Sequence, residues 1–388
     1  MAWPTTPAQA VANQITSRPY IGFVATNGTV ADSTLSGASA LTAWARCVSY
    51  ARASITDLRL VWGNFYANGG EIAGAGSFAI TASVEYPVGV FTQVKFGGSA
   101  SGACAAGALI TSDVVPIAIP NGARFWVRQY FTSAAFSIHY NNIAGIVDLT
   151  QGEGFNYSIG TLADPTMGGA MADASGGAIM IRPLAYLGTT TKASWLLLGD
   201  SRNAGSSDTL SNGMGLRGEL ARLIGQDCGY SNCSRAGEAA SGFNSAGTRR
   251  RLLLPYATHV LCGDGINDII GGANAAATQA SLTTMHNSVA GSGRVLVQTT
   301  LSPGAVTTTD AYATVANQTA GARNSIRVAV NAWIRAIPAP LSNIFDCASI
   351  VESARDSGLW KAPGFTADGT HGTRLANETI SNSIIPVS

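Results

Sequence analysis

Ser201, His371 and Asp368 have the side-chain types of a hydrolytic triad. Ser201 ends the segment "SWLLLGDS", in which an apolar run stops at a glycine and an acid. A serine becomes a nucleophile when a base takes its proton and nearby donors hold the oxyanion. Asp368 precedes His371 by three residues in "TADGTHGT". This spacing lets the carboxylate accept the imidazole N–H and fix its tautomer, so we predict Ser201 as nucleophile, His371 as base and Asp368 as the orienting acid.

The other three histidines are poorer candidates for the base. His139 falls in a strand-rich region, and His286 lies within a helical stretch. His259 opens the apolar run "HVLCGDG". The amino end of a parallel strand is far from the crevice where ligands bind, so His259 is excluded as well.

Two further residues could stabilise an oxyanion. Gly237 follows the polar turn "NCSRA" and can offer its backbone N–H, with Gly229 and Gly242 flanking it. Asn267 in "GINDI" can offer a side-chain amide. We therefore predict an oxyanion hole made of the N–H groups of Ser201 and Gly237 and the amide of Asn267.

The elements that must position these residues lie in the C-terminal half. Apolar runs alternate there with helical stretches at 194–199 and 216–225, 257–263 and 266–290, 294–300 and 322–337, followed by a last run near 343–347. Continuous apolar strands with helical crossovers predict a parallel sheet covered on both faces. The candidate residues follow these runs, at the carboxyl edge where such sheets bind ligands.

The first half has a different period. Residues from about 45 to 185 form short β-branched and aromatic segments between glycine-rich turns, such as "FAITASVEYP" and "ARFWVRQYF". Many short strands of this kind predict an antiparallel, jelly-roll-like β-sandwich. The predicted fold class is therefore all-β followed by α/β. We expect a sandwich accessory domain over 1–190 and a catalytic domain over 191–388, whose fragment 193–388 would fold alone if the interface is modest.

The ordered motifs resemble those of the SGNH hydrolase superfamily, also called GDSL esterases. "GDSRNAG" is similar to the first block, Gly237 occupies the place of the second-block glycine, "GINDI" matches the G-x-N-D third block and "DGTH" is similar to the fifth. The resemblance covers about residues 193 to 385. It implies an SGNH-type parallel sheet and an acyl-enzyme on Ser201, although Gly372 stands where the family often has proline.

The first half carries a second resemblance. The segment "FGGSASGACAAGALITSDVVPIAIPNGARFWVRQYF" is similar to the β-sandwich that precedes the catalytic domain in some secreted bacterial GDSL esterases. Similar two-domain architectures occur among carbohydrate esterases that remove acetyl groups. The resemblance implies an O-acetylated carbohydrate as substrate.

Arg202 follows the nucleophile where the family usually has a small β-branched or apolar residue. Its guanidinium could contact an acidic or sugar substrate, point into solvent, or pair with Asp200 or Asp208. Asp200 itself is expected to be a structural turn acid. Asp268 is expected to cap or salt-link the helix that follows the third strand.

We expect no cofactor and no metal. Asp264 in "CGDGIND" suggests a calcium loop, but the ligand series and the closing glutamate are missing. The sequence contains no C-x-x-C pair, no H-E-x-x-H and no P-loop motif. For the cysteines, disulfides between Cys228 and Cys233 and between Cys47 and Cys104 are as consistent with the sequence as buried thiols.

The aromatic residues of the first half could be core or a carbohydrate-stacking platform. Core is the default because alternate strand positions face inward. Tyr66 and Trp126 are the candidates for exposure. The full set is Trp62, Phe65, Tyr66, Phe125, Trp126, Tyr130 and Phe131.

Composition limits the partners. Charged residues make up 12% of the 388 residues and the net charge is +1, which argues against nucleic acid because phosphate binding needs a dense basic surface. No run approaches the ~20 apolar residues of a membrane span. A neutral surface of small polar residues is typical of secreted and virion proteins, so we expect an extracellular or virion-associated protein. "MAWPTTPAQAV" lacks the regions of a signal peptide, so a leader was removed or export uses another route.

The leading function is therefore a serine ester hydrolase that removes acetyl or other short acyl groups from a carbohydrate. Short-chain lipid esters and thioesters remain alternative substrates, and transfer to another acceptor is a third possibility. A non-catalytic carbohydrate-binding or virion-surface protein on an esterase-like scaffold is the alternative from a different class.

Overall fold

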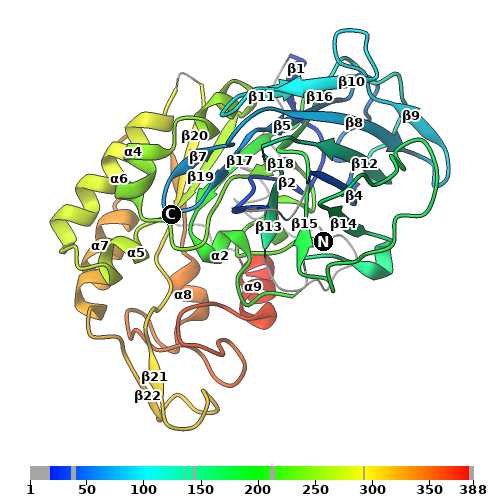
Figure 1. Ribbon diagram of the computed structural model, residues 1–388. Helices are drawn as coiled ribbons and strands as arrows, with labels where there is room; N and C mark the ends of the chain where they lie inside the picture. The colour runs from blue at the N-terminus through cyan, green and yellow to red at the C-terminus, as the bar shows by residue number, and fades with distance from the viewer. Residues whose placement is uncertain are drawn as a thin grey trace, which may run out of the picture.

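The computed structural model describes residues 18–35, 41–135, 137–142, 146–209, 215–291 and 293–383. The stretch "MAWPTTPAQAV" lies outside these ranges, as does Phe136. Figure 1 shows the sheets of the first half beside the sheet and helices of the second half.

The second half is built on a six-stranded sheet of order β2-β18-β17-β19-β20-β23, in which every pair is parallel. The predicted parallel sheet is confirmed. Its strands are β2 (Gly28–Thr29), β17 (Ser194–Gly199), β18 (Gly229–Asn232), β19 (His259–Gly263), β20 (Val295–Thr299) and β23 (Asn343–Phe345). The first of these, β2, comes from the N-terminal half of the chain.

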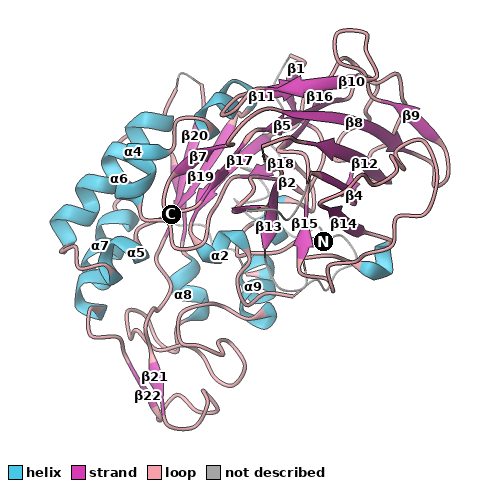
Figure 2. Ribbon diagram, viewed as in Figure 1, coloured by secondary structure: helices cyan, strands magenta, loops and turns pink. Residues whose placement is uncertain are grey.

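Helices cover both faces of this sheet (Figure 2). Leu196 and Leu198 of β17 pack in one core with side chains of α4, α6 and α7, whereas Trp195 and Leu197 pack in another with α3, α8 and α9. Successive side chains of a strand point to opposite faces of the sheet, so the apolar run in β17 makes both faces apolar. The helices are α2 (Ser201–Ala204), α3 (Ala221–Ile224), α4 (Ala240–Ala246), α5 (Ile266–Ile270), α6 (Ala275–Val289), α7 (Asn324–Arg335), α8 (Cys347–Val351) and α9 (Arg374–Asn382).

One predicted helix is shorter in the structure. The helix expected over 216–225 is limited to Ala221–Ile224. Gly218 has a φ of +90°, a left-handed conformation that a helix cannot contain, so the helix begins only after it.

The first half consists of antiparallel sheets, as predicted. A six-stranded sheet has the order β10-β8-β12-β4-β14 with β9 paired to β8, and a four-stranded sheet has the order β1-β16-β5-β11. Their inner faces share one apolar core, in the manner of a sandwich. The strands are β1 (Tyr20–Phe23), β4 (Thr42–Tyr50), β5 (Arg59–Gly63), β8 (Phe78–Glu85), β9 (Phe91–Gln93), β10 (Ser101–Cys104), β11 (Leu109–Thr111), β12 (Arg124–Thr132), β14 (Gly154–Ser158) and β16 (Ala185–Thr190).

Smaller sheets complete the described part of the chain. Three strands pair in the order β15-β13-β3, and two hairpin-like pairs are β6-β7 and β21-β22. Their strands are β3 (Ser33–Thr34), β6 (Phe65–Ala67), β7 (Glu71–Ala73), β13 (His139–Asn142), β15 (Ile179–Met180), β21 (Thr307–Thr308) and β22 (Gln318–Thr319).

The two halves share a core. Phe23, Val61 and Leu187 of the first half lie in the same apolar cluster as Leu196 and Leu198. A buried ion network also crosses between the halves, because Arg250 pairs with both Glu71 and Glu238. The second half therefore folds against the sheets of the first half.

The aromatic platform suggested for the first half is not present. Trp62, Phe65, Phe125, Trp126 and Phe131 are all buried. The guanidinium groups of Arg46 and Arg124 both lie over the Trp126 ring, and half-buried Tyr66 stacks on His139. These cation–π and stacking partners cover ring surface that a sugar would need.

All six cysteines are buried free thiols, so neither suggested disulfide exists. Burial raises the pKa of Cys47 and of Cys104 to about 11. The Sγ atoms of both residues lie near backbone carbonyls instead of each other.

Candidate functional site

Ser201 lies at the carboxyl end of β17. Asp200 caps the short helix α2, since its Oδ1 accepts the N–H of Arg202 at 2.9 Å, and Ser201 is the first helical residue. Gly199 leaves room for the Asn203 side chain, since a Cβ at this position would lie 2.5 Å from Asn203 Nδ2. Asp200 is fully buried and its burial raises its pKa, which fits the predicted structural role. The strand thus delivers Ser201 to the edge of the sheet at a fixed place.

His371 contacts Ser201 directly. Its Nε2 lies 2.8 Å from Ser201 Oγ, and its Nδ1 lies 2.6 Å from Asp368 Oδ2. The turn that carries His371 immediately precedes α9, whereas Ser201 is the first residue of α2, two positions after β17 ends. The structure therefore brings the three predicted residues into one hydrogen-bonded row.

Asp368 holds its own turn as well as the imidazole. Its Oδ1 accepts the N–H groups of Thr370 and His371, each at 2.8 Å. Partial burial raises the pKa of this carboxyl, but the bonds from the His371 N–H, the imidazole and the Thr370 N–H outweigh that effect and leave it lowered. Asp368 is thus held as a carboxylate that can fix the imidazole tautomer.

Asn267 contacts the residue that follows Gly237. Asn267 lies in α5, and its Nδ2 donates to the carbonyl of Glu238 at 2.8 Å. Gly237 has a φ of +74° and is exposed, with open space where a Cβ would stand. The flanking glycines belong to regular elements, because Gly229 lies in β18 packed against Phe23 and Gly242 lies inside α4 with open space at its Cβ position. The geometry joins Asn267 to the 237–238 turn.

Arg202 neither points into solvent nor pairs with Asp200 or Asp208. It is only 5% exposed, and its guanidinium donates to three backbone carbonyls. These are Thr370 O at 3.1 Å, Ser302 O at 3.0 Å and Pro303 O at 2.7 Å. Asp208 pairs instead with Arg222. A buried side chain with these bonds does not reach a substrate.

Two further acidic residues of this region, Asp268 and Asp264, have surroundings that indicate a structural role. The carboxylate of Asp268 accepts the N–H groups of Ala240 and Ser241, so it caps α4. The prediction that it caps its own helix, α5, is therefore wrong. Both carboxyl oxygens of Asp264 are buried without a hydrogen-bond partner among the described residues. Burial, and then the nearby carboxyls of Glu238 and Asp200, raise the pKa of Asp264 well above its usual range.

Sequence reasoning missed the residues that hold the histidine turn. Trp360 Nε1 donates to Gly369 O at 3.1 Å, and the Gly369 N–H donates to Thr366 Oγ1 at 2.9 Å. Thr366 stands two residues before Asp368, and a hydroxyl at that spacing is a recognised turn signal. No local signal marks Trp360.

A cavity of about 230 Å³ lies beside α5. Its walls include Ile266, Ile269 and Ile270, together with Gly304 and Ala305. Ile266 precedes Asn267, and the Ala305 N–H donates to Thr370 Oγ1 beside His371. Ser201, Asn267 and His371 do not line the cavity themselves, so its link to the site runs through Ile266 and Ala305.

The described ranges contain no cluster of three or more His, Cys, Asp or Glu side chains suited to a metal ion. Within the same part of the chain, no helix has the length and apolar character to cross a bilayer.

The C-terminal half of the chain is similar in fold to solved structures of esterases. A member of the lipolytic protein G-D-S-L family from Veillonella parvula is 12% identical, with a TM-score of 0.35 over 48% of this chain and 93% of that chain. A GDSL-like lipase from Bacteroides thetaiotaomicron is 14% identical, with a TM-score of 0.35 over 48% and 83%. An acetyl xylan esterase from Geobacillus stearothermophilus is 12% identical, with a TM-score of 0.35 over 49% and 91%. These are likenesses of fold.

No family model matches the chain, and no curated protein sequence matches it either. The parallel sheet flanked by helices is the SGNH-like arrangement that the sequence motifs resemble.

Proposed function

We propose that the protein is a serine ester hydrolase. Ser201 Oγ attacks the ester carbonyl while His371 Nε2 takes its proton, and Asp368 holds the imidazole. The N–H groups of Ser201 and Gly237 and the amide of Asn267 hold the oxyanion. His371 then returns the proton to the leaving alcohol, and water releases the acyl group from Ser201 by the same route.

The observation that carries this proposal is the unbroken row from Asp368 through His371 to Ser201, with contacts of 2.6 and 2.8 Å. A scaffold kept only for binding has no use for that alignment. The geometry therefore favours an enzyme over a non-catalytic carbohydrate-binding or virion-surface protein.

We propose acetyl or other short acyl groups on a carbohydrate as the substrate, on the strength of the sequence resemblance. The cavity beside α5 favours a second candidate, a short-chain lipid ester or thioester, because its isoleucine wall suits an apolar acyl chain. We further propose that the first half acts as an accessory unit outside the cell. The near-neutral composition of the whole chain supports that location.

The test is hydrolysis of p-nitrophenyl esters of rising acyl length beside acetate release from a panel of acetylated polysaccharides. A carbohydrate acetylesterase should prefer the acetyl ester and release acetate from a polysaccharide. Preference for a longer acyl chain would favour the lipid-ester candidate. Absence of Ser201-dependent hydrolysis from every substrate would overturn the enzyme proposal.

A further inference from the structure

Arg202 connects the nucleophile to the turn that carries the base. Its backbone follows Ser201 in α2, and its Nε donates to the carbonyl of Thr370, the neighbour of His371. Its two terminal nitrogens donate to Ser302 O and Pro303 O. A single side chain thus binds both the histidine turn and the segment that follows β20.

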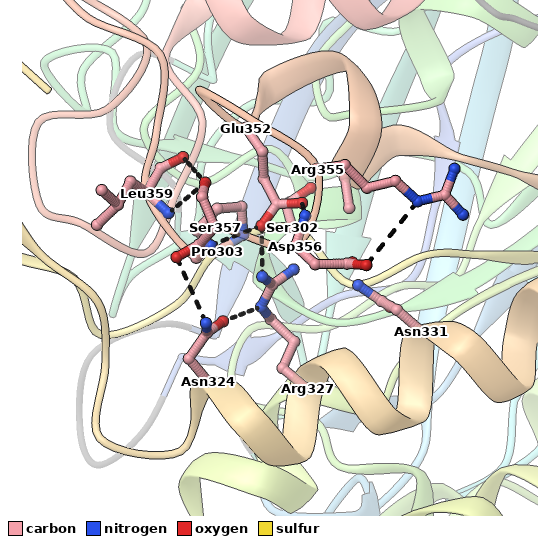
Figure 3. Close-up of polar contacts among 12 residues, drawn as sticks. Ser302, Pro303, Asn324, Arg327, Asn331, Glu352, Arg355, Asp356, Ser357 and Leu359 are labelled. Carbon is pink, nitrogen blue, oxygen red and sulfur yellow. Dashed lines mark hydrogen bonds and ion pairs between the residues drawn. The ribbon is translucent and has the colours of Figure 1, made fainter.

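That segment is itself held from several sides. Arg327 of α7 donates to the carbonyl of Leu301 at 2.8 Å and also binds Asn324 and Glu352 (Figure 3). Arg327 and Arg202 therefore bind three successive carbonyls, those of Leu301, Ser302 and Pro303. A buried carbonyl needs a donor, and these two guanidinium groups supply all three.

The same segment supports the histidine turn a few residues further on. The N–H of Ala305 donates to Thr370 Oγ1 at 3.1 Å, and that of Val306 donates to Gly369 O at 3.1 Å. The path from Ser201 through Arg202 to residues 302–306 and back to His371 is closed by hydrogen bonds. A rotation or shift of the histidine turn would break bonds along the whole path.

We infer that Arg202 is a positioning residue that sets His371 against Ser201. This inference rests on the proposed esterase function. The rigid, planar guanidinium suits the task because it presents several donors in fixed directions, whereas a lysine ammonium is a flexible point charge. A displacement of reacting groups by about 1 Å can cost 100-fold in rate, so small losses of order here should be visible in kcat.

Arg202→Lys and Arg202→Met test this role, and Arg294→Lys is the matched control. Arg294 also donates to three backbone carbonyls, those of Ala257, Val289 and Leu254. It precedes β20 at the amino edge of the sheet, the edge opposite Ser201. The control variant therefore loses a similar set of bonds without touching the histidine turn.

With p-nitrophenyl acetate, we expect kcat of Arg202→Lys to fall by about 10- to 100-fold, and that of Arg202→Met to fall further. KM should change little because Arg202 does not reach the substrate. Arg294→Lys should retain the wild-type kcat whatever its effect on the thermal midpoint. An unchanged kcat in Arg202→Lys, or an effect confined to KM for anionic esters, would overturn the inference.

A second measurement keeps this inference separate from the function. The proton between His371 Nδ1 and Asp368 can be followed by NMR as a downfield imidazole signal in the resting protein. Arg202→Met should shift or broaden that signal, and Arg294→Lys should not. An inactive wild type with this pattern would refute the esterase while preserving the positioning role. An active wild type whose imidazole signal is identical in all variants would preserve the esterase and refute the positioning role of Arg202.

Discussion

The Nε2 atom of His371 lies 2.8 Å from Oγ of Ser201, although the two residues are 170 positions apart in the chain. The contact follows from the parallel sheet, because β17 ends just before Ser201 at the same edge where the histidine turn folds back. Asp368 completes the row from within that turn. The proposed nucleophile and base therefore come from one strand end and one turn, and each can be tested separately.

Ser201→Ala should abolish ester hydrolysis and leave the thermal midpoint nearly unchanged. The hydroxyl lies at the sheet edge and its hydrogen-bond partner is the partly exposed His371, so little of the core depends on it. Ser206→Ala, in the turn after α2, is the control. Rates near wild type in Ser201→Ala, measured with p-nitrophenyl acetate, would remove Ser201 from the mechanism.

His371→Ala should be more damaging than Asp368→Ala. Without the imidazole only the oxyanion hole and binding remain, so we expect a loss of several orders of magnitude in kcat. Without Asp368 the imidazole keeps Nε2 beside Ser201 but loses its orienting partner. The measurement is kcat of both variants under the same conditions. A larger loss in Asp368→Ala than in His371→Ala would exchange the two roles.

Asn267→Ala should lower kcat by about 100- to 1000-fold, the usual effect of removing one oxyanion donor. Its amide already donates one hydrogen to Glu238 O, which fixes its direction and leaves the other hydrogen for the oxyanion. Asn274→Ala is the control. Asn274 caps α6, so this variant should lose about 1 kcal/mol of stability and keep its kcat. Equal kcat in both variants would exclude Asn267 from the oxyanion hole.

The contact of Ser201, His371 and Asp368 could be predicted from the sequence because each motif is local and strand ends converge. The segments around Ser201, Asn267 and His371 each follow an apolar run or belong to a short turn, and a parallel sheet brings such places together. The partners of Arg202 could not be predicted in this way. Ser302 and Thr370 are 100 and 168 residues from it, and their backbone carbonyls carry no residue-type signal.

The same limit applies to the fold. Apolar periodicity predicts which side chains are buried, and it located β17, β19 and β20. It does not predict the neighbours of a buried side chain. The addition of β2 to the parallel sheet depends on two residues, Gly28 and Thr29, that have no strand pattern of their own. The placement of Arg46 of β4 over the Trp126 ring of β12 is likewise a property of neighbouring strands.

Asp264→Asn should change how stability depends on pH. The pKa of this buried carboxyl is raised in the folded chain, so its protonated form favours the fold. Its contribution is fully present below the unfolded pKa and is lost as pH rises through the raised value. The wild type should therefore lose thermal stability with rising pH through that range, and Asp264→Asn should lose less. Exposed Asp227→Asn is the control, and parallel curves for all three proteins would contradict the expectation.

The fragment 193–388 should not fold as a stable unit, because the interface with the first half is not modest. It would lose β2 from the parallel sheet and Phe23, Val61 and Leu187 from the shared core. Arg250 would keep Glu238 but lose Glu71. We expect an insoluble fragment, or a soluble one without a cooperative thermal transition, and recovery when residues 18–192 are co-expressed. Circular dichroism and hydrolysis of p-nitrophenyl acetate measure both effects, with the full chain as reference. Cooperative unfolding of the fragment alone, with a rate within about tenfold of the full chain, would show that the catalytic half is an autonomous domain despite this contact.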